Sequence, residues 1–102
     1  PVGQGFFPHG VLFALRVQGD SMVLAGINSG DIAVIRQQEQ VENGEIAAVL
    51  VEEEATLKRV HRTIDHIRLE AENDNVPDIR IDRGTLDIRV LGLYVGLIRR
   101  VR

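Results

Sequence analysis

One serine and one lysine in this chain have the side chains needed to cleave a peptide bond. Ser21 lies in the segment GDSM (19–22), and no histidine is near it in sequence. A serine hydroxyl must be activated by a base, and a lysine can serve when burial lowers its pKa enough to leave the amine neutral. Lys58 is the only lysine, and the other eleven of the twelve Lys and Arg residues are arginines, which keep their proton. A Ser-Lys pair here must therefore use Ser21 and Lys58.

The three histidines offer no comparable site. His9, His61 and His66 lie in no catalytic motif, and the last two, five residues apart across a turn, lack the i,i+4 spacing of a helical metal pair. We expect them on strand surfaces or in solvent. No glycine-rich segment opens a helix after a strand, as a phosphate-binding loop does. The sequence therefore predicts neither a metal site nor a cofactor.

Strand alternation around the lysine leaves two interpretations open. In a strand, Thr56, Lys58 and Val60 share one face and Leu57 lies on the other. A lysine between threonine and valine is a candidate half-buried amine that Thr56 could orient by a hydrogen bond. Leu57 makes the other face partly apolar as well. From chemistry alone, a solvated Lys58 and a Ser21 that only caps a short helical turn remain the alternative.

The segments that must position these residues are short and β-prone. Strands are predicted at 11–17, 32–37, 46–51, 56–62, 66–71, 79–81 and 85–101. A helical turn is predicted at 21–26, with Asp20 or Ser21 as its cap and Gly26 at its end. The acidic residues 52–54 are interpreted as a solvated hairpin tip. Strands with turn signals about every 8–12 residues predict an all-β barrel or sandwich.

Length and composition indicate a single folded domain. The chain has 102 residues, 44% of them apolar, and a net charge of −3, which argues against binding a phosphate backbone by itself. Cysteine is absent, so disulfides and thiolate chemistry are excluded. No apolar run reaches the roughly 18–20 residues of a membrane span, and no signal peptide is visible. Residues 1–10, with two prolines and three glycines, are expected to form an irregular amino-terminal arm.

Several segments resemble, in order and spacing, the LexA-type self-cleaving repressors, a Ser-Lys autoprotease family that includes UmuD and phage repressors. They are GDSM (19–22), GINSGD (26–31), NGEIAAV (43–49), EATLKR (54–59), LEAEN (69–73) and GLYVGLIR (92–99). Lys58 follows Ser21 by 37 residues, as the family's lysine segment follows its serine segment. Ala71 stands where the family often has proline. The similarity covers about residues 12 to 99.

The resemblance implies a small LexA/signal-peptidase-like β fold of short, strongly bent strands, in which serine and lysine meet at the end of a cleft. Carried over by position, Ser21 is the nucleophile and Lys58 the general base. The backbone N–H of Ser21, with a neighbouring amide, is the expected oxyanion donor. Met22 and Thr56 are the expected supporting residues.

Members of the family cut their own chain at a small dipeptide, typically Ala-Gly, when a RecA–single-stranded DNA filament stabilises the cleavable form. The one Ala-Gly pair here, at 25–26, lies within the turn of the nucleophile and cannot fold back as substrate. We therefore expect the scissile bond and an operator-binding domain to lie outside this chain. Residues 1–102 then form the carboxyl-terminal autoprotease and dimerisation domain of a cytoplasmic repressor of the DNA-damage (SOS) response.

The carboxyl-terminal segment VLGLYVGLI (90–98) is the predicted dimer interface. A terminal strand in a small domain is expected at a sheet edge, where an uncharged apolar strand invites pairing, and two glycines allow close backbone approach. We expect a two-fold homodimer, as the family implies. The expected interface residues are Val90, Leu91, Gly92, Leu93, Tyr94, Val95, Gly96 and Leu97. Burial of the strand within its own sheet is the alternative.

Two other functions fit the same resemblance. One is a UmuD-like subunit that binds a translesion polymerase, which the sequence upstream of Pro1 would distinguish from a repressor. The other is a phage-type dimerisation module in which the Ser-Lys pair no longer acts. Signal peptidases share the Ser-Met and lysine pattern, but they need a membrane anchor, and no segment of this sequence predicts one.

Overall fold

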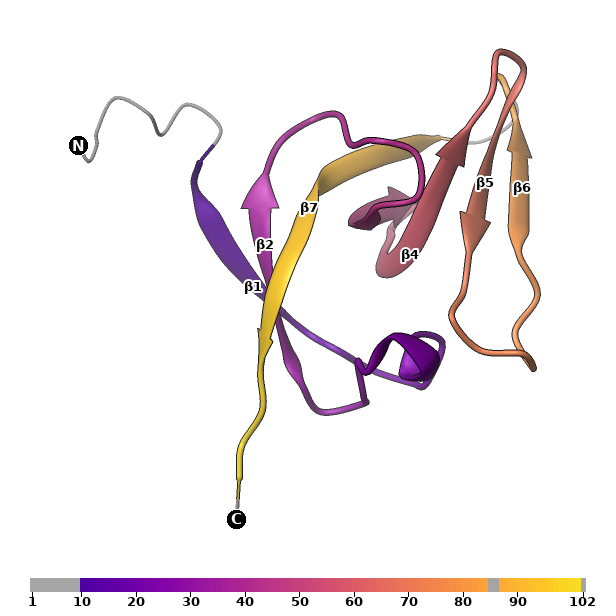
Figure 1. The fold of residues 1–102 in the computed structure, drawn as a ribbon. Helices are drawn as coiled ribbons and strands as arrows, with labels where there is room; N and C mark the ends of the chain where they lie inside the picture. Colours follow the sequence, from indigo (N-terminus) through magenta and orange to yellow (C-terminus); the bar gives the residue numbers. More distant parts are fainter. Residues whose placement is uncertain (1–9, 85–86, 102) are drawn as a thin grey trace.

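The protein folds around one bent antiparallel sheet. The computed structural model describes residues 10–84 and 87–101, and its seven strands are ordered β1-β2-β7-β3-β4-β5-β6 (Figure 1). The strands are β1 (Leu12–Arg16), β2 (Ile32–Gln37), β3 (Ile46–Val51), β4 (Glu54–Arg62), β5 (His66–Glu70), β6 (Ile79–Asp82) and β7 (Ile88–Ile98). The only helical element in these residues is a 3-10 turn, η1 (Val23–Ala25). The all-β prediction is confirmed.

The helical turn that follows Ser21 is closed by backbone rather than by a side-chain cap. Met22 occupies the N-cap position and makes no side-chain capping bond, so the expected cap by Asp20 or Ser21 is wrong. At the other end, Gly26 adopts φ 82°, and its N–H donates to the carbonyl of Val23. This left-handed conformation is the one that glycine adopts without steric cost. Gly26 ends the turn as predicted.

Several predicted strand boundaries changed by one to three residues, and two predictions fall partly outside the described residues. The acidic stretch is not all turn, because β4 begins at Glu54 and only Glu52 and Glu53 form the hairpin turn. Of the predicted arm, only Gly10 is described. The last strand begins at Ile88, and residues 85–86 lie outside the described part. No helix in the described residues is long and apolar enough to cross a membrane.

Strand β7 lies inside the sheet, which contradicts its predicted place at an edge. Its carboxyl-terminal half, from Gly92 to Ile98, pairs with β2, and its amino-terminal half, from Ile88 to Leu93, pairs with β3. Figure 1 shows β7 running from the β3-β4 part of the sheet to the β1-β2 part. With eleven residues, β7 is long enough to join a β1-β2 hairpin to a β3-β4-β5-β6 meander. The edges of the sheet are β1 and β6 instead.

Gly92 marks the point where β7 passes from one partner to the other. A Cβ at this position would overlap the backbone carbonyl of Arg36 and lie 2.7 Å from Cγ2 of Ile35. The close backbone approach at Gly92 is therefore made by β2 of the same chain, whereas the prediction concerned a second copy. Gly96, by contrast, has open space where a Cβ would be.

The middle of the sheet, at β3 and the adjoining part of β4, is buried on both faces. One core consists of Met22, Ile27, Ala33, Ile35, Ala48 and Leu57, and the other of Ala47, Val49, Val60, Leu69 and Ile81. Neighbouring residues of β3 contribute to opposite cores. In β4, Leu57 belongs to the first core and Val60 to the second. Such two-sided burial explains why residues 46–51 are apolar at every position. Met22 lies in the first core, so the segment that carries Ser21 is anchored directly beside that serine.

Candidate active site

Ser21 and Lys58 meet in the structure. The Nζ atom of Lys58 lies 3.3 Å from the Oγ atom of Ser21. Ser21 comes from the loop between β1 and η1, and Lys58 comes from the middle of β4. Nucleophile and base side chains within hydrogen-bond reach, slightly loose without substrate, are the geometric signature of an activated nucleophile. The expected proximity of the two side chains is therefore present.

The environment of Lys58 lowers the pKa of its amine. The residue is 6% exposed, which contradicts the alternative of a solvated lysine. Burial lowers the pKa of the Lys58 amine from its ordinary 10.5, and the negative charge of Glu54 opposes that shift. Desolvation penalises the charged amine, whereas a nearby carboxylate stabilises it. Lys58 therefore releases its proton more readily in this site than a lysine does in water.

The amine has a complete set of partners. Besides Ser21, Nζ lies 2.7 Å from Oγ1 of Thr56 and 3.2 Å from the carbonyl oxygen of Leu57. A protonated amine donates three hydrogen bonds, one to each of these oxygens. A neutral amine has two N–H groups and one lone pair. With its two donors on Thr56 and Leu57, its lone pair can accept the Ser21 hydroxyl proton.

Two backbone N–H groups, those of Ser21 and Met22, have no acceptor among the described residues. The Met22 carbonyl is occupied, since it accepts from the N–H groups of Ala25 and Ile27. Unpaired N–H groups next to a nucleophile are the usual components of an oxyanion hole. The Met22 side chain is buried in the first core.

The serine opens onto a cavity of about 310 Å³. Its walls come from residues 15–18, 21–22 and 54–57, which include Ser21, Thr56 and Glu54. The cavity therefore lies between the end of β1 and the start of β4, and Glu54 is the acidic group on its wall. A peptide entering this space would reach the hydroxyl of Ser21 directly.

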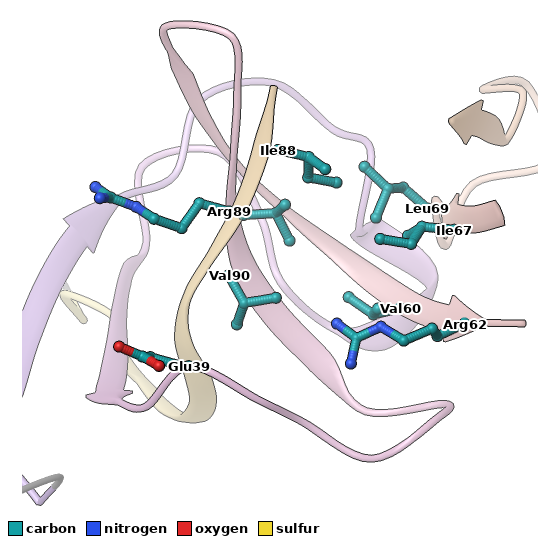
Figure 2. A pocket seen from close by; sticks show the side chains of 9 residues that line it. Glu39, Val60, Arg62, Ile67, Leu69, Ile88, Arg89 and Val90 are labelled. Carbon is teal, nitrogen blue, oxygen red and sulfur yellow. The ribbon is translucent and has the colours of Figure 1, made fainter. Parts of the chain in front are cut away.

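A larger cavity of about 390 Å³ lies elsewhere on the sheet and does not include the two residues. Figure 2 shows Ile88 and Val90 of β7 facing Val60, Ile67 and Leu69 across it, with Arg62 close to Val60. Glu39 and Arg89 complete the side chains labelled at its rim. Val60 follows Lys58 by two positions, so both point to the same face of β4. This cavity and the amine thus share one side of the strand.

The other residues singled out from the sequence lie apart from this site. His61 pairs with Glu70 across β4 and β5 at 2.7 Å, and His66 contacts Asp65 and Thr63 at 2.9 Å each. Both are strand-surface histidines, as predicted. His9 lies outside the described residues. No group of three or more metal-binding side chains occurs in the described part of the chain.

An ion pair that sequence reasoning missed braces the segment that follows Ser21 and η1. Asp31, 3% exposed, is held by Arg99, whose Nε and Nη2 atoms lie 2.8 and 2.7 Å from its two carboxylate oxygens. Arg99 also donates to the carbonyl of Gly26, and the N–H of Asn28 donates to Asp31. These hydrogen bonds, Arg99 first, lower the pKa of Asp31 from 3.8 to about 2. The two residues are 68 positions apart, so no local pattern joins them.

The predicted interface residues divide between buried and accessible positions. Leu91, Tyr94 and Leu97 pack against the first core, Val90 packs against the second, and Gly92 is buried between strands. Leu93 and Gly96 are partly buried. Val95 is 39% exposed. The strand therefore serves its own sheet first, and only part of it remains accessible.

Comparison with known proteins assigns the family. The Peptidase S24-like family profile matches residues 1–95. A LexA repressor of Leptospira interrogans is 48% identical over 83 residues, which are 81% of this chain and 41% of the relative. LexA repressors of Desulforamulus reducens and Caldicellulosiruptor saccharolyticus are 42% and 45% identical, over 96% and 87% of this chain. The chain spans less than half the length of these relatives, 41–44%. It therefore belongs to the Peptidase S24-like family, with LexA repressors among its relatives.

Proposed function

We propose that this chain is the autoproteolytic and dimerisation domain of a LexA-like repressor of the DNA-damage response, with Ser21 as nucleophile and Lys58 as general base. The observation that carries the proposal is the 3.3 Å approach of Lys58 Nζ to Ser21 Oγ, with the lysine 6% exposed. An exposed lysine would stay protonated and could not accept the serine proton. A buried lysine that did not contact a serine would have no nucleophile to activate.

The proposed reaction is acyl transfer followed by hydrolysis. Ser21 Oγ attacks the carbonyl carbon of the scissile peptide while its proton passes to Lys58 Nζ. The Ser21 N–H, with the neighbouring Met22 N–H, stabilises the oxyanion that forms. The Lys58 ammonium then protonates the leaving nitrogen, which releases the amine product and leaves an acyl ester on Ser21. A water molecule, deprotonated by Lys58, hydrolyses the ester. Thr56 orients the amine throughout.

The substrate in this proposal is a segment outside the chain. A LexA-type repressor cuts an Ala-Gly bond that precedes its catalytic domain, and the small residues would fit next to Ser21. Apolar side chains before the bond would occupy the cavity of Figure 2, which lies on the same face of β4 as the lysine. A RecA–single-stranded DNA filament would stimulate the reaction. Operator DNA would be bound by a domain that lies outside this chain.

A homodimer built on β7 is part of the proposal, in a narrower form than the sequence predicted. Within the described residues, β3 pairs with β7 only up to Leu93, so the side of β7 that faces away from β2 has no strand partner beyond that residue. Val95 and Ile98 on this stretch are 39% and 60% exposed. An unpaired, uncharged strand edge with exposed apolar side chains is suited to pair with a second copy.

Cleavage between separate chains tests the mechanism. The chain should slowly cut a longer LexA-type repressor whose own nucleophile is replaced, because the two are no longer tethered at high effective concentration. Ser21→Ala should remove the nucleophile and Lys58→Met the base, each lowering the rate by about 10³-fold or more. The rate is followed by gel analysis, and circular dichroism verifies that both variants are folded. Cleavage that persists in Ser21→Ala would exclude Ser21 as nucleophile. Failure of the intact chain to cut at any pH would favour the inert dimerisation module.

A further inference from the structure

Two residues far along the chain hold the backbone on both sides of the nucleophile. Glu72 and Asn73, here called the 72–73 clamp, follow β5 and contact the loop that contains Ser21. The Glu72 N–H donates to the Ser21 carbonyl at 2.8 Å, and the Leu24 N–H donates to the Glu72 carbonyl at 2.8 Å. The Asn73 side chain donates from Nδ2 to the Asp20 carbonyl at 2.8 Å. The peptide groups before and after Ser21 are thus each held by one member of the clamp.

The Asn73 amide is itself held in one orientation. Its Oδ1 atom accepts the Asn75 N–H at 2.8 Å, while Nδ2 faces the Asp20 carbonyl. An N–H needs an acceptor and a carbonyl needs a donor, so the two contacts together determine which end of the amide is which. The side chain therefore presents a fixed N–H donor to the peptide group that joins Asp20 to Ser21.

That peptide group carries the amide that the proposed reaction needs. In a trans peptide, the carbonyl and the N–H of the same planar group point in opposite directions. Holding the Asp20 carbonyl on Asn73 therefore directs the Ser21 N–H away from the clamp, and this N–H has no acceptor among the described residues. A hydrogen bond to the carbonyl also polarises the group and strengthens its N–H as a donor. The same argument applies to the Ser21 carbonyl, the Glu72 N–H and the Met22 N–H.

We propose that Asn73 is a positioning residue that sets the orientation of the Ser21 N–H as oxyanion donor. The inference rests on the proposed function, because an oxyanion forms only if Ser21 attacks a carbonyl. Asn73 touches neither substrate nor the reacting atoms, and it acts through the Asp20–Ser21 peptide group. An oxyanion hole contributes mainly when its donors are already aimed at the developing charge.

An ion pair connects the clamp to the strand that carries the base. Arg59, the neighbour of Lys58 in β4, lies with Nε 3.1 Å from Oε2 of Glu72 and also donates to the Gly44 carbonyl. The Ser21 loop and the Lys58 strand are therefore held to one another through Glu72. A shift of Glu72 would move the Ser21 backbone relative to Lys58, so the dyad depends on Glu72, whereas Asn73 acts on the Asp20–Ser21 peptide group.

Two substitutions at Asn73 separate its two hydrogen bonds. Asn73→Asp keeps an acceptor for the Asn75 N–H but places a carboxylate oxygen against the Asp20 carbonyl, and Asn73→Ala removes both bonds. Loss of a whole oxyanion donor costs about 10²–10³-fold in kcat, so we expect a misdirected donor to cost about 10–100-fold. KM should stay within about twofold, because the ground-state substrate carries no oxyanion. The affinity of a peptide boronate, whose adduct with Ser21 is tetrahedral, should fall by a similar factor.

The assay is the cleavage of a separate repressor chain, with kcat compared where the pH profile is flat. Asn43 provides a matched control, because it also makes two hydrogen bonds, with the N–H and carbonyl of Arg62, at 2.8 and 3.2 Å, away from the site. Asn43→Ala should lose stability as Asn73→Ala does and keep wild-type kcat. The pH midpoint should be the same in Asn73→Ala as in wild type, since Lys58 keeps its partners.

Each outcome decides the inference. A folded Asn73→Asp variant with wild-type kcat would overturn the inference. It would also be overturned if both Asn73 variants lost activity only in proportion to the fraction of molecules that are unfolded. An equal loss in Asn43→Ala would show a general effect of stability and would also overturn it. If the wild-type chain cuts nothing, the proposed function fails, and this inference fails with it. A loss of kcat confined to the Asn73 variants, with KM preserved, supports the positioning role.

Discussion

The behaviour of a single amine determines what this site can do. Lys58 is buried, and its neutral form can accept the Ser21 proton while its two N–H groups remain on Thr56 and Leu57. Because burial lowers its pKa, and because only the neutral amine is a base, the cleavage rate should rise with pH up to a plateau. Glu54 acts against burial, since its charge raises the same pKa.

Replacing Glu54 tests this balance at the residue scale. Glu54→Gln removes the charge that favours the ammonium, so the pKa of Lys58 should fall and the midpoint of the pH–rate profile should move to lower pH. The rate should increase on the acidic limb and stay unchanged on the plateau. The measurement is the rate of cleavage of a separate chain across a pH series. Glu53→Gln, at the hairpin turn, is the control and should leave the midpoint in place. A midpoint that moves to higher pH would contradict the assignment of Lys58 as the base.

At the scale of elements, the end of β7 braces the loop that begins beside the nucleophile. Arg99 follows β7 directly and holds both Asp31, which precedes β2, and the carbonyl of Gly26, which ends η1. Asp31 is buried and Arg99 is partly exposed. The pair depends on the fork geometry of the guanidinium, because two of its nitrogens donate to the two carboxylate oxygens of Asp31. Lysine could not reproduce two parallel contacts.

Acid sensitivity of the fold tests this brace. The pKa of Asp31 is about 2 in the folded chain against 3.8 ordinarily, so its contribution to stability is complete above about pH 4 and is lost as pH falls toward 2. Asp31→Asn should lower the midpoint of urea unfolding at pH 7 and flatten the decline of stability between pH 4 and 2. Arg99→Lys should show a smaller effect of the same sign. Asp74→Asn, at an exposed loop position, is the charge-matched control. An acid profile of Asp31→Asn that equals that of wild type would contradict the brace.

At the scale of the whole molecule, the question is whether two copies pair through the open part of β7. Val95 is 39% exposed beside a strand edge that β3 no longer covers. A charge there would be buried without a partner in a dimer, which is costly, but would remain hydrated in a monomer. We therefore expect the wild-type chain to sediment as a dimer at tens of micromolar and Val95→Asp to raise the dissociation constant by about 10-fold or more. Ile64→Asp, in the exposed turn after β4, should have no effect. A wild-type chain that is monomeric at this concentration would exclude the dimer.

The sequence by itself determined the fold class, most strand positions and which serine and lysine form the Ser21–Lys58 contact. Strands and turns follow from local patterns of apolar, glycine and asparagine residues, because side-chain alternation and turn conformations depend on near neighbours. The pair followed from scarcity, since Lys58 is the only lysine, together with the spacing of the LexA-type segments. The sequence could not choose between a buried and a solvated Lys58, because Leu57 made both faces of the strand apolar.

Tertiary structure alone decided the remaining features, because each of them joins residues that are distant along the chain. The place of β7 between β2 and β3 depends on which strands pair. The residues of β2 that pair with β7 lie more than 50 positions before it in the chain. The contacts of Asn73 with Asp20 and of Arg99 with Asp31 span 53 and 68 positions. Both Asn73 and Arg99 lay in segments that resembled the family, but no local pattern indicates which carbonyl or carboxylate a side chain will meet. Long-range pairing is set by how the whole chain packs, and that packing determined how Ser21 is held opposite Lys58.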